Sequence, residues 1–357
     1  MRITHIAFTA QGSVWYYAPN KVAPIVFAAL FFVSGLVHLW QNSRYKAWKI
    51  TPLLPWAALL MTAGFATREV GAHNYDDVGI YIASTVLIMT GPPVYAAVNY
   101  IVFSRLLYYV PYLSPVHPMR VLVTFLGVDV IIEVLIANGV ARVANTGNSL
   151  HSRQVGEDLL RSALILQAVF FVIFALIGVR FQWACHKKGV LNRNLKTVLY
   201  VMYASCALIT TRCVYRIVEY FQGFDGTIYD TEWYFWVFEA TIMFLNTLLL
   251  NVFHPGRFLP ASSKSFLGVD GAEREGPGWE DKRAFLFRLL DPLDIYGLLI
   301  SRDKHAKFWE WTPEELEAYI AKQNQDKADR DASGCFPWSS RRRSPAAAAG
   351  GSKASSV

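Results

Sequence analysis

The sequence predicts an all-α, polytopic membrane protein with seven transmembrane helices. Seven long apolar runs lie between Val22 and Phe253, and a helix needs about 20 apolar residues to cross the hydrocarbon core of a bilayer. The 357 residues are 54% hydrophobic and only 17% charged, whereas a soluble domain carries roughly a quarter charged residues. The charge deficit lies before Pro255, so we expect an apolar body followed by a polar tail.

The predicted helices follow these apolar runs. They cover residues 22–40, 53–71, 80–107, 121–143, 163–183, 197–221 and 233–253. The third run contains Gly91-Pro92-Pro93. Two consecutive prolines remove two backbone donors and therefore predict a kink in this helix. The kink is either fixed or a hinge.

Charges in the connections predict the orientation in the membrane. The first, third and fifth connections are basic, whereas the second and sixth are acidic. Lys and Arg favour cytosolic loops, which places the amino terminus outside and the tail in the cytosol. We therefore expect an extracellular segment (1–21), a seven-helix domain (22–256) and a cytosolic tail (257–357). The plasma membrane is the expected location, and another endomembrane is the alternative.

The tail is expected to hold short amphipathic helices and a disordered end. Residues 282–304 are rich in apolar side chains but broken by Pro292, which is typical of a segment on the membrane surface. Thr312-Pro313-Glu314-Glu315 combines an N-cap, a proline at the first helical position and a capping-box glutamate, and predicts a helix to about Gln325. From Asp326 onward the composition predicts disorder.

Ionisable residues inside the spans are the candidates for function. Asp129 lies near the middle of the fourth span, and Glu133 follows one turn later on the same face. A charge that meets lipid at the helix centre costs about 2.5–3.5 kcal/mol on an insertion scale. These side chains should therefore face the interior of the bundle.

The sixth and seventh spans carry the densest group of charges. Arg212, Arg216 and Glu219 form one stripe on the sixth span, together with the neighbouring Tyr215, and Glu239 lies about two turns into the seventh. Glu69 closes the second span. In the predicted orientation all of these charges, with Glu133, fall in the outer half of the membrane. They predict a polar cavity lined by spans four, six and seven.

Two interpretations of these charges stay open. In the first, an internal ion-pair network holds the helices in register without a ligand. Its members are Arg212, Arg216, Glu133, Glu219 and Glu239. In the second, the group binds the polar head of an amphiphile or exchanges protons, and its excess of acids favours a cationic or protonatable partner. Asp129 is the best candidate to change protonation, since its depth favours the neutral carboxyl, unless it only bonds a neighbouring helix.

Other classes of function are disfavoured. The net charge is +7, but Lys and Arg lie mostly in short loops and the tail, as membrane topology requires, so no nucleic-acid partner is expected. The sequence has no Gly-x4-Gly-Lys-Ser/Thr loop for a nucleotide. The eight His are scattered, whereas a catalytic zinc needs about three converging ligands. We expect no metal, no cofactor and no enzymatic activity.

A set of motifs spreads over roughly residues 15–260. The most specific is Arg212-x-x-Tyr215-Arg216-x-x-Glu219. The others are Tyr17-x-Pro19, Pro92-x-x-Tyr95, Tyr100, Arg105, Asp129, Gly139, Gln167, Gly223, Gly226, Glu232, Tyr234, Asn251 and His254-Pro255. In order and spacing they resemble the fungal lipid-translocating exporter family, whose founding members were linked to 7-aminocholesterol resistance.

The sequence also departs from that family's pattern. Ile136 stands where the pattern has Gln, Glu239 stands where it has Asp, and Glu133 is an additional acid. Arg68-Glu69-Val70-Gly71 only approximates the second-span element. If these positions touch the substrate, its head group should differ from that of better-known members.

The resemblance implies a membrane transporter or floppase-like exporter of amphiphilic lipids or lipid-like toxic compounds. Sphingoid bases, sterol amines and porphyrin-like molecules are the implied substrates, and stress or drug resistance is the implied role. Membrane lipids or amphiphilic small molecules are the implied partners. The alternative is a seven-helix lipid-sensing receptor without transport activity, which span number and topology do not separate from a transporter.

Overall fold

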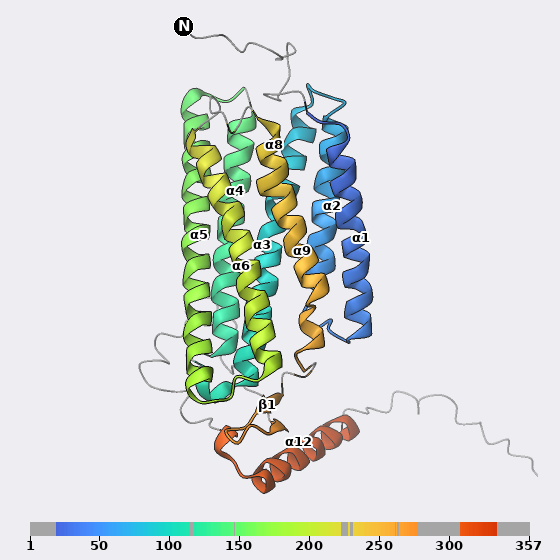
Figure 1. Cartoon of the computed structure of the whole chain (residues 1–357), viewed down its shortest axis with the longest axis vertical. Coiled ribbons are helices and arrows are strands. Elements are labelled where there is room, and N and C mark those ends of the chain that lie inside the picture. The colour runs from blue at the N-terminus through green and yellow to red at the C-terminus, as the bar shows by residue number, and fades with distance from the viewer. Residues whose placement is uncertain are drawn as a thin grey trace, which may run out of the picture. The chain divides into compact units, whose positions relative to one another are not determined.

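The computed structural model describes residues 19–114, 117–145, 147–222, 228, 231–260, 262, 264–276 and 308–333. The chain divides into two compact units between Trp309 and Glu310. The first unit holds a bundle of long helices (Figure 1). The described part of the second unit is dominated by one helix, α12 (Pro313–Ser333).

Seven long helical segments form the bundle. They are α1 (Ala23–Arg44), α2 (Leu53–Gly71), α3 (Val78–Tyr109), α4 (Pro118–Ala144), α5 (Leu150–Lys187), α6 (Arg193–Gln222) and a composite segment of α8 (Glu232–Phe235), the π-helical η2 (Trp236–Thr241) and α9 (Ile242–Val252). Six of them are long and apolar enough to cross a membrane. The remaining segment, α2, is less apolar because Arg68 and Glu69 lie in its last turn. The predicted all-α, polytopic fold is confirmed.

The apolar runs predicted the positions of the helices well, but they did not always predict where a helix begins or ends. The bounds of α2 are those predicted, whereas α5 begins at Leu150 and not at residue 163. Ser149 caps this helix by accepting a hydrogen bond from the backbone N–H of Ser152, and Arg161 pairs with Glu157 at 3.1 Å one turn away. A capped, charge-paired helix continues past its apolar stretch, so apolarity marks only the part that suits the hydrocarbon.

The helices form a closed ring with α3 as its most buried member. Each helix from α1 to α6 contacts the next, α6 contacts α9, and α9 returns to α1. The contact between α3 and α6 crosses the ring, and α3 is the most buried of the six apolar spans. Pro92 and Pro93 lie inside α3, which is helical from Val78 to Tyr109. A hinge at this point stays a prediction.

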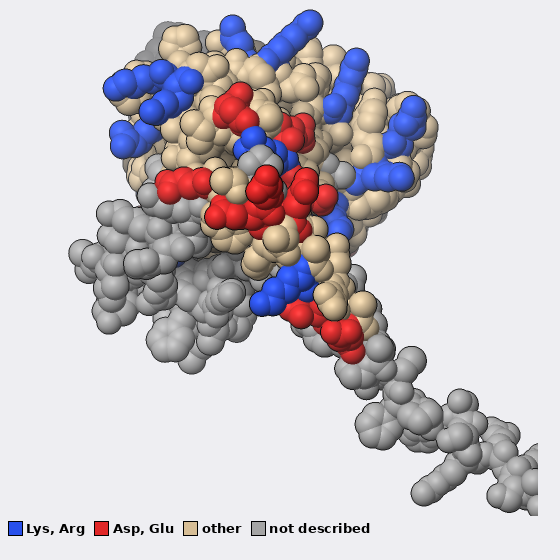
Figure 2. All heavy atoms as spheres, turned by 90° about the horizontal axis from the view of Figure 1, so that it is seen from below, with Lys and Arg blue, Asp and Glu red and all other residues tan. Residues whose placement is uncertain are grey.

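The two ends of the bundle differ in charge. The α1–α2 and α5–α6 connections lie at the same end (Figure 1) and carry exposed Arg44, Lys46, Lys49, Lys187, Lys188, Arg193 and Lys196. Figure 2 looks onto this end and shows Lys and Arg around its rim. The α2–α3 connection at the opposite end carries exposed Asp76 and Asp77. The orientation and the three predicted segments of the chain stay predictions.

A small β-hairpin follows the last helix. β1 (Ser265–Leu267) pairs antiparallel with β2 (Glu273–Glu275), with Phe266 opposite Arg274. The hairpin contacts α3, and the Tyr112 hydroxyl donates a hydrogen bond to the Gly268 carbonyl at 3.3 Å. Burial raises the pKa of Tyr112 to about 12, so this hydroxyl keeps its proton at neutral pH.

The capping box predicted in the tail is confirmed, but the predicted end of its helix is wrong. The Thr312 N–H donates to Glu315 Oε2 at 2.8 Å, and the Glu315 N–H donates to Thr312 Oγ1 at 3.3 Å. The helix continues through Asp326 to Ser333, because a polar composition does not stop a helix and the first glycine after its start is Gly334. The predicted membrane-surface segment 282–304 lies outside the described residues, as does most of segment 1–21.

Candidate functional site

A buried ion pair joins α6 to the last helix. Arg212 lies on the stripe of α6 that faces Glu239, and its Nε and Nη2 atoms both lie 2.9 Å from the Glu239 carboxylate. Arg212 is 1% exposed and Glu239 is not exposed at all. Two parallel contacts between a guanidinium and a carboxylate fix the orientation as well as the distance.

Arg216 and Glu219 extend this pair along α6. Arg216 Nε donates to Glu239 Oε2 at 2.6 Å, and its Nη1 donates to Glu219 Oε2 at 2.7 Å. The Tyr215 hydroxyl donates to the other oxygen, Glu219 Oε1, at 2.9 Å. We call Arg212, Tyr215, Arg216, Glu219 and Glu239 the α6–α9 network. It contains two formal positive and two formal negative charges, so it is balanced.

Glu239 lies in the π-helical segment η2. A π-helical turn holds one residue more than an α-helical turn, so it rotates the side chains before it relative to the side chains after it. The Thr241 hydroxyl donates to the Trp236 carbonyl at 2.8 Å, which occupies a backbone acceptor inside this segment. A π-bulge is frequent at functional sites, and here it sets the face on which Glu239 meets Arg212.

Glu69 does not join the α6–α9 network. Its carboxylate lies 3.5 Å from His73 at the end of α2. The neighbouring Arg68 reaches the last helical segment instead. Its Nη2 donates to Glu232 Oε1 at 3.1 Å, and its guanidinium carbon lies 4.1 Å from the centroid of the Phe235 ring. The grouping of Glu69 with the other acids is therefore not supported by the geometry.

Asp129 and Glu133 face α3 from the neighbouring α4. Asp129 is 6% exposed and lies beside Tyr100. Glu133 Oε2 accepts a hydrogen bond from the Thr90 hydroxyl at 3.3 Å. Asp129 Oδ2 and Glu133 Oε1 are buried and have no hydrogen-bond partner among the described residues. Buried polar atoms are almost always paired, so these two oxygens need an explanation.

The two interpretations of the charges thus apply to different residues. The predicted ion-pair network is present for Arg212, Arg216, Glu219 and Glu239. Glu133 was expected in it but has no ion pair within the described residues. Asp129 and Glu133 are two acids beyond the balanced network. The predicted chamber lined by α4, α6 and α9 stays a prediction. One pocket among the described residues lies between α3, α6 and α9, and another lies between α1 and α2.

A second polar cluster was missed by sequence reasoning. Thr247 of α9 is its centre: it receives the Tyr95 hydroxyl at 2.8 Å and lies within hydrogen-bond distance of Ser34 and His38 of α1. Asn251 donates to Ser34 at 2.5 Å. His38 is fully buried in α1. Its partner Thr247 lies 209 residues away along the chain, so no local pattern reveals this contact.

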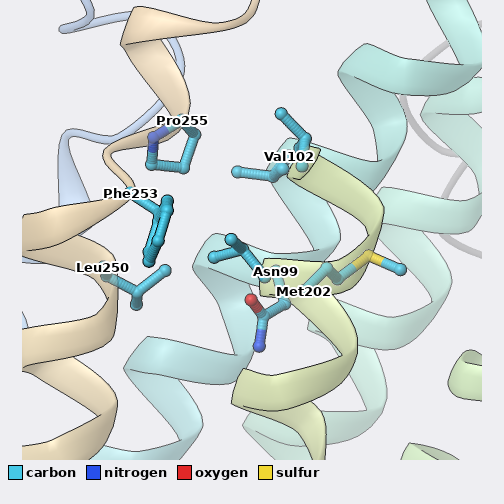
Figure 3. Close-up of a pocket in the computed structure, with 8 residues that line it drawn as sticks. Asn99, Val102, Met202, Leu250, Phe253 and Pro255 are labelled. Carbon is cyan, nitrogen blue, oxygen red and sulfur yellow. The ribbon is translucent and has the colours of Figure 1, made fainter. Parts of the chain in front are cut away.

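A small pocket lies near this cluster, between α3, α6 and α9 (Figure 3). Its volume is about 10 Å³, and Asn99, Met202, Leu250, Phe253 and Pro255 are among its lining residues. Asn99 donates to Ser205 at 2.9 Å. This space suits about one water molecule, so the pocket is too small for an amphiphile.

Fold and site together define a class: a multi-pass helical membrane protein with a buried ion-pair network of zero net charge and two further acids, the buried Asp129 and the partly buried Glu133. Comparison with known proteins gives the family. Residues 55–262 match the family model described as "RTA1 like protein". The chain belongs to this family, which confirms the resemblance noted in the sequence.

Three relatives, all fungal, illustrate the similarity. The chain is 38% identical over 318 residues to "Lipid-translocating exporter-like protein RTA1" of Leptosphaeria maculans, covering 82% of this chain and 60% of the relative. It is 35% identical to a protein of the same name from Ajellomyces capsulatus (77% and 90%). It is 28% identical to "Protoporphyrin uptake protein 1" of Saccharomyces cerevisiae (68% and 93%).

The chain thus spans 60% of the length of the Leptosphaeria relative and most of the other two. No solved structure matches the chain. The helices and these relatives show an integral, multi-pass membrane protein of a fungal family, and two of the three relatives are named as lipid-translocating exporter-like proteins. None of the three names describes an enzyme. Among the described residues no group of three or more His, Cys, Asp or Glu could hold a metal ion.

Proposed function

We propose that this protein transports amphiphilic molecules with a cationic or protonatable head group across the membrane, as an exporter or floppase. Sphingoid bases, sterol amines and porphyrin-like molecules are the candidate substrates, and resistance to such compounds is the biological role. The plasma membrane is the proposed location. The names of the relatives, which describe lipid translocation and protoporphyrin uptake, support an amphiphilic substrate.

The observation that carries the proposal is a pair of acids on α4, the buried Asp129 and the partly buried Glu133. Asp129 and Glu133 lie one turn apart, and each has a buried oxygen without a partner in the described structure. The arginines of the α6–α9 network are already paired with Glu219 and Glu239. A buried carboxylate oxygen without a hydrogen-bond partner is disfavoured, so the second oxygens of Asp129 and Glu133 are best satisfied by a proton or by a cationic group.

This suggests a division of roles. Asp129 and Glu133 bind the head group or exchange protons with it: the ionised carboxylate attracts a cation, and protonation releases it. The α6–α9 network holds α6 and α9 at a fixed spacing around that event and has no free charge of its own. The chain has no nucleotide-binding loop, so transport is downhill or coupled to a gradient. Glu69 lies apart from Asp129 and Glu133 and is given no role in binding.

Lipid flux in liposomes tests the proposal. The purified protein is reconstituted with a fluorescent sphingoid base, a sterol amine and a porphyrin, and movement of each across the bilayer is followed. We expect movement of at least one of these amphiphiles. Asp129→Asn should abolish this movement, because Asn cannot be ionised, while expression of the protein at the membrane stays unchanged. Glu157→Gln is the matched control, since Glu157 pairs with Arg161 at a partly exposed position.

The receptor alternative predicts a different outcome. No movement of any of the three amphiphiles, with a folded protein, would favour a lipid-sensing receptor. Movement that survives in Asp129→Asn would remove Asp129 from the transport mechanism while leaving transport itself in place.

A further inference from the structure

An apolar groove lies on the surface of the bundle between α1 and α2, which form one edge of the bundle in Figure 1. Its volume is about 340 Å³. Phe31 forms part of its floor, while Leu36, Trp56 and Leu59 line it and are about half exposed, at 51%, 53% and 49%. In a membrane these exposed side chains face acyl chains and not water.

Small and internally satisfied residues shape the groove. Gly35 has no side chain, and a Cβ there would lie 3.2 Å from the Cβ of Ala58 on the facing helix. Small residues of this kind let membrane helices approach closely. Thr62 also lines the groove, and its hydroxyl donates to the Ala58 carbonyl of its own helix at 2.8 Å. The groove therefore offers mainly apolar packing, which suits a hydrocarbon chain.

The groove has the length of one leaflet. Its lining on the second helix runs from Pro52 to Thr62, and ten residues at the helical rise cover about 15 Å. The hydrocarbon core is about 30 Å thick. Because Pro52 and Trp48 belong to the α1–α2 connection, the groove lies in the leaflet at the basic end of the bundle.

Basic residues are neighbours in sequence of Trp48, which lines one end of the groove. Arg44, Lys46 and Lys49 are exposed in the same connection as Trp48, and the sequence from Arg44 to Trp56 contains no Asp or Glu. Juxtamembrane basic residues attract anionic lipids of the adjacent leaflet. The apolar lining suits an acyl chain, and the neighbouring basic residues suit an anionic head group.

The geometry points to a binding site for an anionic phospholipid, with one acyl chain in the groove and the head group against Arg44, Lys46 and Lys49. This lipid is distinct from the transported amphiphile. The groove is lined by residues of α1, α2 and their connection, whereas Asp129 and Glu133 lie on α4. The sign of the charge also differs, because the two acids favour a cationic head group and the neighbouring basic residues favour an anionic one.

Native mass spectrometry of the purified, delipidated full chain tests this site. Phosphatidylserine and phosphatidylcholine with the same acyl chains are titrated separately, and bound lipids are counted. Each basic residue near an anionic lipid contributes about fivefold in affinity, so phosphatidylserine should bind at least about tenfold more tightly. Lys46→Gln combined with Lys49→Gln should remove most of this preference.

Variants that fill the groove test the contribution of the acyl chain to lipid binding separately from the contribution of the basic residues. Thr62→Trp should lower the affinity for both lipids, and Leu36→Trp does the same if the first variant folds poorly. Ile131→Trp is the matched control, because Ile131 is 59% exposed on the apolar α4. Equal binding of the two lipids, or unchanged binding in both filled variants, overturns the proposal. Loss of a dimer without loss of lipid would identify a second copy as the occupant and also overturn it. Transport by Thr62→Trp is measured in parallel, since this site can be wrong while the proposed transport stands.

Discussion

Arg212 and Glu239 show that two buried charges depend on each other for the stability of the fold. Either side chain alone would be an unpaired charge in a region shielded from water, and the loss of one partner leaves the other uncompensated. Asp129 and Glu133 also lie within the bundle, but neither has an ion pair among the described residues. The same residue type therefore has two physical roles in one bundle, and the partner decides which.

The first prediction concerns Arg212. Arg212→Ala should destabilise the folded protein by about 3–5 kcal/mol, because it strands a buried Glu239. The measurement is folded yield and apparent melting temperature in detergent by fluorescence-detected size exclusion. Arg161→Ala is the control: Arg161 is partly exposed and pairs with Glu157, and such a pair contributes at most about 1 kcal/mol. Normal yield and melting of Arg212→Ala would show that the pair does not stabilise the bundle.

Single elements decide which of these side chains meet. The π-helical segment sets the face of Glu239, and deletion of Thr241 should rotate Glu239 by about 100° relative to α9, which is the rotation per residue of an α-helix. We expect a loss of folded yield similar to that of Arg212→Ala. Thr241→Ala keeps the register and should be close to wild type. If the deletion variant folds normally, the register of this segment is not what positions Glu239.

The contact between α4 and α5 depends on two glycines. A Cβ at Gly139 would lie 2.9 Å from the Gly156 carbonyl oxygen and 2.6 Å from Leu160 Cγ. Gly139→Leu should therefore push the helices apart and lower folded yield severalfold in the size-exclusion assay. Gly127→Leu on the same helix is the matched control, because nothing lies within 4 Å of a Cβ there. Equal yields of the two variants would contradict a close-packing role for Gly139.

The elements also show what the sequence can and cannot predict. The number of helices follows from runs of apolar residues, and α2 was predicted to the residue. The start of α5 was not, because a capped and charge-paired helix needs no apolarity. The stripe of charges on α6 was visible in the sequence, but its pairing with Glu239, and not Glu133, depends on the rotation of helices that pack across the ring. The partners of His38 and Thr247 depend on the same tertiary register.

At the scale of the whole molecule, exposed charges in the helix connections differ between the two ends of the bundle. One end has exposed Arg and Lys in the α1–α2 and α5–α6 connections, and the other has Asp76 and Asp77 between α2 and α3. Lys and Arg in short loops stay on the cytosolic side. The groove proposed for an anionic lipid opens at the basic end, and anionic lipids are concentrated in the cytosolic leaflet. The two inferences therefore require the same orientation.

Cysteine labelling in intact cells tests that orientation. The native Cys185, Cys206 and Cys213 are buried, so single cysteines can be added at exposed positions after Cys335→Ser. In the orientation predicted from the loop charges, a membrane-impermeant maleimide should label Asp76→Cys strongly and leave Lys188→Cys unlabelled. Permeabilised cells, in which both positions should react, are the control for accessibility. If only Lys188→Cys is labelled in intact cells, the orientation is opposite to the predicted one. The α6–α9 network would then lie in the cytosolic half of the membrane.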